Sequence, residues 1–272
     1  MEGQMYKIVF SDADGTLLNS QRVITPKTER AIKSLQSKGI PFVIVSARSP
    51  LGIKTIMRAH DLTCPLIAFS GGLIMDEQGN VLYHKGIRKS KAADIVSFVE
   101  STGIDCVWSV YSLNQWIVQN DLDPRIIREQ SHVLVQPIKG SVDMIVDDQI
   151  NKILCICNAE DTERLELAVK EKFPDCYVAK SSDRLLEIMH GSVSKATAVE
   201  KLCGVMGLST NDAVAYGDNY NDAEMLRSVG MGVLMGNAPQ PLQQQIPNHT
   251  QDNNSDGVYH SLLRLGLVES QE

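Results

Sequence analysis

Several features that mark specialised classes of protein are scarce or missing in this sequence. Aromatic residues make up only 5% of the chain, and no apolar run approaches the roughly 20 residues that a membrane-spanning helix needs. The net charge of −7 leaves no basic excess for nucleic acid or an anionic membrane surface. We therefore expect neither of these partners, and the lack of a basic-then-apolar leader favours a cytoplasmic protein.

Cysteine is present but not in a pattern that suggests metal binding or cross-linking. The six cysteines are scattered, and no two are spaced as C-x-x-C. Cys155 and Cys157 lie two residues apart in an apolar run, which places them on one face of a predicted strand. Buried free thiols are therefore the favoured interpretation over a metal site or a disulfide.

Aliphatic residues, by contrast, are abundant, and the 272-residue chain is long enough for one large domain or two modest ones. Apolar runs at 7–10, 41–45 and 65–69 alternate with helical patterns. An unbroken apolar run is typical of a strand buried on both faces. Strands that alternate with helices predict right-handed crossovers and a parallel sheet. The fold class predicted is therefore α/β, with a doubly wound, Rossmann-like parallel sheet.

The pattern changes in the middle of the chain and then returns. Residues 85–183 show mixed α+β periodicity, and both tryptophans, Trp108 and Trp116, lie there. We predict a core domain formed by residues 1–84 and 184–272, interrupted by an inserted α+β domain at 85–183. Trp108 is expected to belong to the core of the insert.

Carboxylates gather where two of the predicted strands end. D-A-D-G-T (12–16) follows the first strand, and G-D-N-Y-N-D (217–222) follows a later one. Because the carboxyl ends of strands in an open parallel sheet line the ligand crevice, Asp12 and Asp218 are expected to meet. A cation would relieve the repulsion, and an all-oxygen donor set favours Mg²⁺ or Ca²⁺ over zinc. This set comprises Asp12, Asp14, Asp218 and Asp222.

Taken together, the motifs resemble those of the haloacid dehalogenase superfamily. The resemblance rests on D-A-D-G-T-L-L after a strand, a hydroxyl residue after the second strand, a lysine at a helix start, and G-D-x-x-N-D, in that order. The insert resembles the cap of the Cof-type sugar-phosphatase branch, and the tail at 250–258 resembles that branch's closing segment. The match spans nearly the whole chain.

The resemblance implies a role for each matching residue. Asp12 would attack phosphorus and form an aspartyl phosphate, while Asp14 would act as general acid and base, with its backbone carbonyl on Mg²⁺. Asp218 would bind the metal, and Asp222 would be a ligand or lie close by. Residues two apart in an extended segment share a side, so Asp12 and Asp14 are expected to face the same crevice. The phosphate would be held by Ser46, Ala47, Arg48, Lys195 and Asn221.

Two departures from the family pattern bear on specificity. Ser46-Ala47-Arg48 stands where relatives usually have Thr-Gly-Arg, and Ser70-Gly71-Gly72 stands where they usually have Asn-Gly-Ala. The first keeps the hydroxyl and the amide that phosphate binding needs, whereas the second could alter a contact near the leaving group. The substrate predicted is therefore a small phosphorylated metabolite, a sugar phosphate or a cofactor phosphate, without a finer choice.

Three interpretations of the whole chain stay open at this point. The favoured one is a Mg²⁺-dependent phosphatase acting through aspartyl phosphate. A phosphomutase would use the same phosphoaspartate but must keep water from it. A catalytically idle binding or regulatory protein could keep the same fold. The intact set of Asp12, Asp14, Lys195 and Asp218 favours an enzyme.

Overall fold

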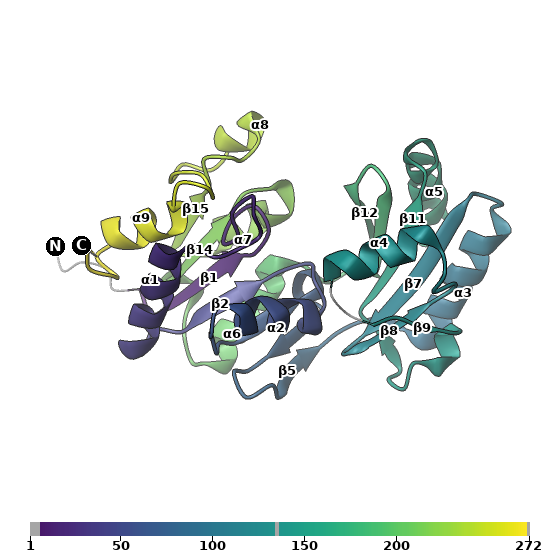
Figure 1. Ribbon diagram of the computed structural model, residues 1–272, viewed down its shortest axis with the longest axis horizontal. Helices are drawn as coiled ribbons and strands as arrows, with labels where there is room; N and C mark the ends of the chain where they lie inside the picture. The colour runs from purple at the N-terminus through teal and green to yellow at the C-terminus, as the bar shows by residue number, and fades with distance from the viewer. Residues whose placement is uncertain (1–5, 134–135, 271–272) are drawn as a thin grey trace. The chain divides into compact units, whose positions relative to one another are not determined.

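The computed structural model describes residues 6–133 and 136–270 (Figure 1). The chain forms two compact units, and the second is an insertion into the first. No helix in these described ranges is both long and apolar enough to cross a membrane. The first unit comprises the described residues of Met1–Ala47, Ile53–Leu82 and Ser194–Glu272, and the second comprises Arg48–Gly52 and Tyr83–Val193.

A seven-stranded sheet forms the centre of the first unit. Its first five strands pair in parallel, and β4 runs antiparallel to β3. The predicted α/β fold class is confirmed. In spatial order the strands are β15 (Met231–Leu234), β14 (Ala213–Gly217), β1 (Ile8–Asp12), β2 (Phe42–Val45), β3 (Leu66–Ala68), β4 (Leu73–Met75) and β5 (Val81–His84).

The strand order creates a crevice at the carboxyl end of β1. Within the sheet, β2 lies next to β1 on one side, and β14, which comes much later in the chain, lies next to β1 on the other. In register, Ser11 lies opposite Tyr216 of β14, and Asp12 lies opposite Val45 of β2. Ligands of open α/β sheets bind at such a reversal of strand order. The residues that follow β1 and β14 therefore line the expected binding crevice.

Helices of the first unit begin and end where local signals predict. In the first helix, α1, the hydroxyl of Thr25 accepts a hydrogen bond from the Thr28 amide, and Pro26 occupies the first turn. Gly39 follows this helix with a φ of 72°, a conformation that glycine adopts without strain. The helices are α1 (Pro26–Ser37), α2 (Pro50–Ala59, of which the part from Ile53 onward belongs to this unit), α6 (Lys195–Val205), α7 (Ala223–Ser228), α8 (Gln240–Gln243) and α9 (Gly257–Arg264), with short 3₁₀ turns η1 (Phe69–Gly71), η3 (Thr210–Asp212) and η4 (Tyr220–Asp222).

The second unit contains a six-stranded sheet and a two-stranded one. The larger sheet is antiparallel except for its last pair, β8 and β9. In spatial order it consists of β12 (Cys176–Ser182), β13 (Leu185–His190), β11 (Lys152–Cys157), β7 (Cys106–Ser112), β8 (Gln115–Val118) and β9 (Ile138–Lys139). The smaller sheet pairs β10 (Gln149–Ile150) with β6 (Ile87–Arg88), and the helical segments are α3 (Lys89–Ser101), α4 (Pro124–Val133), α5 (Ala159–Lys172) and the 3₁₀ turn η2 (Val142–Met144).

The core of the second unit lies between its large sheet and the helices α3 and α5. Trp108 belongs to this core and is 4% exposed, as predicted. All six cysteines of the chain are free thiols. Four are buried as expected, while Cys106 and Cys176 are half-buried.

Most predicted elements match the structure, but some differ at their ends. The strand expected at 7–10 begins at Ile8 and continues to Asp12. Helices α4 and α9 are not among the expected elements. The proposed role of the insert as a cap over the site stays a prediction.

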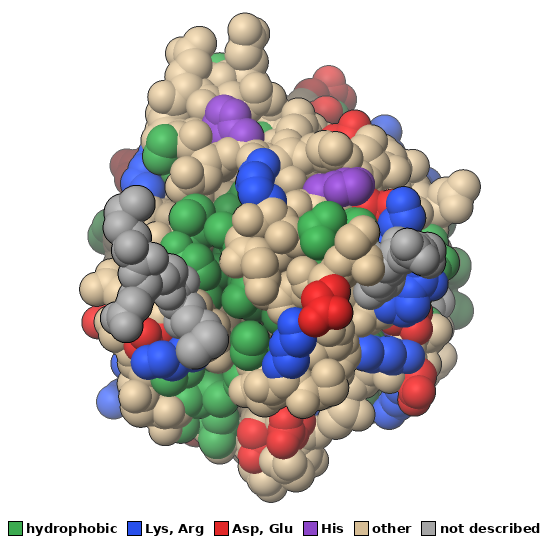
Figure 2. All heavy atoms as spheres, turned by 90° about the vertical axis from the view of Figure 1, so that its left-hand side faces the viewer, with side chains coloured by type: hydrophobic (Ala, Val, Ile, Leu, Met, Phe, Trp, Pro, Cys, Tyr) green, Lys and Arg blue, Asp and Glu red, His purple; other side chains and the backbone are tan. Residues whose placement is uncertain are grey.

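On the face shown in Figure 2, basic and acidic side chains are intermixed around an irregular strip of hydrophobic ones.

Candidate active site

Asp12 is the last residue of β1, and the residue is only 7% exposed. Directly after it the chain turns, because the Leu17 amide bonds to the Asp12 carbonyl at 3.2 Å and the Leu18 amide bonds to the Ala13 carbonyl at 2.9 Å. Asp14 lies in this turn and its side chain is exposed. The backbone therefore leaves the strand between Asp12 and Asp14, so strand periodicity does not put them on one side. That both line the same crevice stays a prediction.

Lys195 connects Asp12 to a second buried carboxylate. Its Nζ lies 2.5 Å from Asp12 Oδ1 and 2.6 Å from Asp222 Oδ1, and the lysine is 2% exposed. Lys195 is the first residue of α6. Ser194 and Thr197 cap the start of this helix with a reciprocal capping box. A cation at a helix start is unfavourable with respect to the helix dipole, and two carboxylates offset that disadvantage here.

Asp222 uses both of its oxygens within the protein. Besides the contact with Lys195 through Oδ1, its Oδ2 accepts hydrogen bonds from the backbone amides of Asp218 and Asn219, each at 3.0 Å. The residue is completely buried in η4. Gly217 makes room for it, because a Cβ there would lie 2.4 Å from the Asp222 Cβ. Asp222 thus ties the G-D-N-Y-N-D turn to Lys195.

Asp218 follows β14 and faces the turn after β1. Thr16 Oγ1 donates a hydrogen bond to Asp218 Oδ1 at 2.7 Å, and Asn237 Nδ2 lies 3.5 Å from Oδ2. Gly15 has a φ of 81°, and a Cβ on it would lie 2.4 Å from Asp218 Oδ2. Only glycine therefore permits both this backbone conformation and this close approach.

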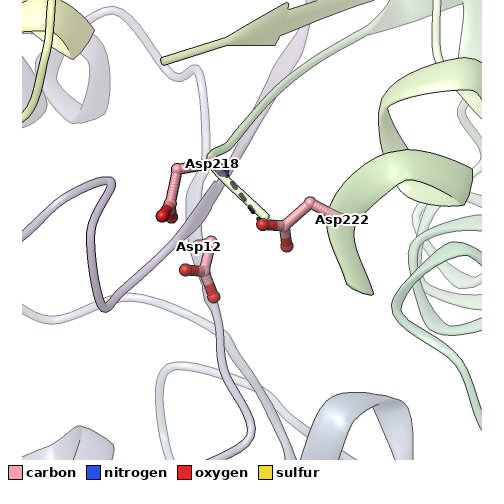
Figure 3. A group of neighbouring side chains, drawn as sticks. All are labelled: Asp12, Asp218 and Asp222. Carbon is pink, nitrogen blue, oxygen red and sulfur yellow. Dashed lines mark hydrogen bonds between the residues drawn. The ribbon is translucent and has the colours of Figure 1, made fainter. Parts of the chain in front are cut away.

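Three carboxylates converge in this crevice, as Figure 3 shows. One ligand oxygen from each of Asp12, Asp218 and Asp222 lies within 4.8 Å of the other two. The donor set is entirely oxygen, which suits a hard divalent cation such as Mg²⁺. The residues present therefore fit a metal ion of the kind that the sequence predicts.

Burial and mutual repulsion shape the ionisation of the cluster. Burial raises the pKa of Asp12 to about 8; Lys195 opposes this rise and the charge of Asp222 adds to it. Burial also raises the pKa of Asp218 to about 6, where the Thr16 hydrogen bond opposes and the charges of Asp222 and Asp14 add to the rise. Burial alone would lower the pKa of Lys195, but Asp12 and Asp222 outweigh it and leave that pKa raised. Lys195 therefore stays a cation at neutral pH.

The other predicted phosphate-binding residues are placed less uniformly. Ser46 follows β2 with 1% exposure, and its amide bonds to the Ile67 carbonyl at 2.9 Å. Ala47 is half-buried next to it, whereas Arg48 belongs to the second unit. Asn221 is exposed on η4, and across residues 6–133 and 136–270 its side chain makes no hydrogen bond. The structure thus joins Asp12, Lys195, Asp218 and Asp222 by direct contacts. The catalytic and binding roles of these residues, and of Asp14, Ser46, Ala47, Arg48 and Asn221, stay predictions.

The Ser70-Gly71-Gly72 departure has a structural consequence in the first unit. Phe69, Ser70 and Gly71 all have positive φ, and a Cβ on Gly71 would lie 2.2 Å from the Ser194 carbonyl oxygen. Gly71 therefore allows η1 to pack against the start of α6, where Lys195 sits.

Two residues of the site are not among those that the sequence singles out. Thr16 is the last residue of the D-A-D-G-T motif, so the motif points to it, but the sequence alone suggests no role for its side chain. Asn237 lies in M-G-N-A-P, and no local pattern marks it. Their contacts with Asp218 emerge only from the folded chain.

Comparison with known proteins agrees with this geometry. Residues 9–262 match the profile of the haloacid dehalogenase-like hydrolases, and the chain belongs to this family. A Haemophilus influenzae protein whose name describes a candidate phosphatase is 38% identical over 256 residues, which is 93% of this chain and 96% of that protein. The expectation of an enzyme, a phosphoric monoester hydrolase in class, is confirmed at the level of the family.

Two further similarities cover almost the full length. The HMP-PP phosphatase of Yersinia pseudotuberculosis is 28% identical over 254 residues, 89% of this chain and 88% of that enzyme. A haloacid dehalogenase-like hydrolase from Bacteroides thetaiotaomicron has a crystal structure that covers 96% of this chain and 99% of its own, with a TM-score of 0.87 at 24% identity. This last likeness shows the fold.

Proposed function

We propose that the protein is a Mg²⁺-dependent phosphatase that hydrolyses phosphate monoesters of small metabolites through an aspartyl phosphate on Asp12. The observation that carries this proposal is the buried contact of Asp12 with Lys195, beside the carboxylate of Asp218. A carboxylate attacks a phosphate dianion only if nearby positive charge offsets the repulsion. This crevice supplies one cation and a donor set for a second.

Each residue has a chemical task in the proposed mechanism. Asp12 Oδ attacks phosphorus, so that a P–O bond to Asp12 forms while the bond to the leaving oxygen breaks. Asp14, exposed in the adjoining turn, gives its proton to that leaving oxygen and later takes one from the water that hydrolyses the aspartyl phosphate. Lys195 stabilises negative charge on the transferred phosphoryl group, and Ser46 and the Ala47 amide orient it.

The metal would be held by Asp12, Asp218 and the Asp14 carbonyl. When bound, Mg²⁺ would offset the charge of the carboxylates and of the phosphoryl oxygens. Asp222 already accepts hydrogen bonds on both oxygens from Lys195, Asp218 and Asn219. We therefore assign it the task of anchoring Lys195 and the 218–219 backbone.

The second unit is proposed to be the cap that selects the leaving group and excludes bulk water. Support comes from its insertion between parts of the first unit and from the family to which the chain belongs. Hydrolysis is favoured over phosphoryl transfer within one substrate, the mutase alternative, because relatives along nearly the full chain carry phosphatase names. The buried contacts of Lys195 with Asp12 and Asp222 argue against a protein that keeps the fold without catalytic activity.

The proposal is tested by phosphate release from p-nitrophenyl phosphate with Mg²⁺ and with EDTA. We expect turnover only with Mg²⁺. Hydroxylamine added during turnover should convert an aspartyl phosphate into a hydroxamate, and mass spectrometry should find it on the peptide that contains Asp12. Turnover that persists in EDTA would contradict the metal requirement, and a hydroxamate on another residue would contradict the assignment of the nucleophile.

A panel of phosphorylated metabolites would then identify the substrate class. It should contain sugar phosphates and cofactor phosphates, together with HMP-PP, the compound named for the Yersinia relative. A phosphomutase would instead convert a sugar monophosphate into its isomer without net phosphate release. Product analysis of the sugar phosphates therefore separates the two activities.

A further inference from the structure

The polar C-terminal tail makes ordered contacts with the turn that follows β1. Asn253 Nδ2 donates to the Leu18 carbonyl at 2.8 Å, and Asn254 Oδ1 accepts from the Ser20 amide at 3.0 Å. A little further on, Thr25 Oγ1 donates to Asp256. The tail therefore runs alongside residues 18–25, which lie more than 200 positions earlier in the chain.

Asn237 connects this tail to the catalytic turn itself. Its Nδ2 donates to the Gly15 carbonyl at 2.8 Å and lies 3.5 Å from Asp218 Oδ2. Its Oδ1 accepts the backbone amide of Asn253 at 3.1 Å. One side-chain amide thus contacts the turn after β1, the turn after β14 and the tail.

The backbone around Asn237 is held in place independently of its side chain. The Met235 amide donates to the Gly217 carbonyl at 2.9 Å, and the Gly236 amide donates to the Gln251 carbonyl at 3.2 Å. These two bonds fix the segment next to the G-D-N-Y-N-D turn on one side and the tail on the other. The Asn237 side chain is therefore presented to Gly15 from a rigid support, which is what a positioning residue requires.

The Gly15 carbonyl and the Thr16 side chain each make a hydrogen bond that ties this turn to the site. Asn237 holds the Gly15 carbonyl, and Thr16 Oγ1 holds Asp218 Oδ1. The Asp14–Gly15 peptide adjoins the held Gly15 carbonyl, so a displacement of Gly15 would shift the Asp14 carbonyl with it. Loss of the Asn237 side chain would also remove the Nδ2 donor that faces Asp218 Oδ2.

We propose that Asn237, braced by Asn253, is a positioning residue that sets the orientation of the Asp14–Thr16 backbone and of the Asp218 carboxylate for metal binding and catalysis. This inference rests on the proposed function of the same site. Asn237 touches neither the nucleophile nor the phosphate in this assignment, and acts through Gly15 and Asp218. Groups that orient metal ligands in this way typically change metal affinity or activity by roughly 10- to 100-fold when they are removed.

The test compares Asn237→Ala and Asn237→Asp with wild type. Asn237→Asp keeps the size and the acceptor oxygen but places an oxygen where the amide faces Gly15 O and Asp218, so we expect it to be at least as impaired as Asn237→Ala. Mg²⁺ affinity is measured by calorimetry on the full chain without substrate, and kcat and KM are measured separately. We expect Mg²⁺ to bind roughly tenfold more weakly and kcat to fall, with KM for p-nitrophenyl phosphate nearly unchanged.

Asn248→Ala is the matched control. Asn248 is also an asparagine whose Nδ2 bonds to a backbone carbonyl of the first unit, that of Gly232 at 3.3 Å, but it contacts neither Gly15 nor Asp218. We expect wild-type Mg²⁺ affinity and kcat in this variant. Hydrogen–deuterium exchange should rise in peptides covering 13–20 for Asn237→Ala and stay unchanged there for Asn248→Ala.

The outcomes separate this inference from the proposed function. If wild type hydrolyses phosphate esters and Asn237→Ala keeps its Mg²⁺ affinity, kcat and exchange rates, the inference is overturned and the proposed function stands. If wild type binds Mg²⁺ but hydrolyses nothing, the proposed function fails, and the difference in Mg²⁺ affinity still decides the role of Asn237. A fall in melting temperature alone, with unchanged Mg²⁺ affinity, would also overturn the inference.

Discussion

Lys195 Nζ lies 2.5 Å from Asp12 Oδ1, although 183 positions separate the two residues in the chain. Lys195 also contacts Asp222, so a single buried cation lies between two buried carboxylates. Such a group is costly to bury alone and becomes tolerable only through its partners. The stability of the first unit and the proposed chemistry therefore depend on the same three side chains.

Replacing Lys195 by methionine should destabilise the protein and abolish most activity. The substitution leaves Asp12 and Asp222 buried without their cation, which should lower the free energy of unfolding by about 3–5 kcal/mol. Urea unfolding measures this loss. Lys201→Met, at an exposed position of the same helix, is the control and should change stability by less than about 0.5 kcal/mol. Equal effects of the two substitutions would contradict the buried role of Lys195.

Replacing Asp12 by asparagine should remove activity without unfolding the protein. The variant has no nucleophile, so kcat with p-nitrophenyl phosphate should fall by more than about a thousandfold. Lys195 keeps Asp222 as its partner, and one buried negative charge is gone, so the melting temperature should hold or rise. Asp76→Asn, in the turn before β5 where Asp76 bonds to Asn80, is the control and should keep full activity. Retained activity in Asp12→Asn would exclude Asp12 as the nucleophile.

Two glycines with similar backbone conformation should respond differently to alanine. Gly15 and Gly39 have φ values of 81° and 72°, so alanine strains both positions by about 1–2 kcal/mol. Only at Gly15 does the new Cβ meet another group, Asp218 Oδ2 at 2.4 Å; around Gly39 nothing lies within 4 Å. Gly15→Ala should therefore weaken Mg²⁺ binding and reduce kcat, while Gly39→Ala lowers the melting temperature alone. Equal Mg²⁺ affinity in both variants would show that the turn moves freely.

Stabilisation by Mg²⁺ should increase with pH. Folding raises the pKa of Asp12 from 3.8 to about 8 and that of Asp218 from 3.8 to about 6. Between pH 3.8 and about pH 8 the folded protein without metal therefore binds more protons than the unfolded chain. The contribution of these two carboxyl groups to stability consequently falls as the pH rises. Mg²⁺ binds the ionised carboxylates and competes with those protons.

Thermal unfolding with Mg²⁺ and with EDTA measures this linkage. At about 100 times its Kd, Mg²⁺ stabilises the folded state by about 2.7 kcal/mol, and the gain should be larger near about pH 8 than near about pH 5.5. Asp218→Asn should flatten the difference. A gain from Mg²⁺ that is the same at both pH values would mean that the ion binds elsewhere.

Local chemistry explains why the sequence predicts so much of the fold. Apolar runs such as 41–45 can be buried on both faces only as inner strands of a sheet, and Thr25-Pro26 begins a helix by capping its own first turn. Helix α4 has a comparable start, since Pro124 is its first residue and Asp123 Oδ1 accepts the Arg125 amide at 2.8 Å, but Pro124 by itself suggests only a turn. Among the described residues, the side chain before the tail helix α9 makes no such cap. Helix α9 begins at Gly257 directly after Asp256, a residue with a φ of 55° that contacts Thr25 far away in the sequence.

Part of the candidate site can likewise be predicted from the sequence, and part cannot. The identities of Asp12, Asp14, Lys195 and Asp218 follow from motifs that stand at strand and helix ends, where residue type and order carry the information. The sequence also suggests that Asp12 and Asp14 share a side, but the bonds of the Leu17 and Leu18 amides turn the backbone at Ala13 and leave only Asp12 buried. Strand periodicity does not contain that turn.

By itself, the sequence determines the α/β class, the family and the chemical groups available to the crevice, because these depend on local periodicity and on side-chain type. Tertiary structure alone decides that Asp222 anchors Lys195, that Thr16 bonds to Asp218, and that Asn237 reaches the Gly15 carbonyl across 222 positions of the chain. Each of these contacts joins segments that become neighbours only when β14 and the tail pack beside β1. A hydrogen bond requires its two atoms within about 3 Å, and only the packed chain brings them that close.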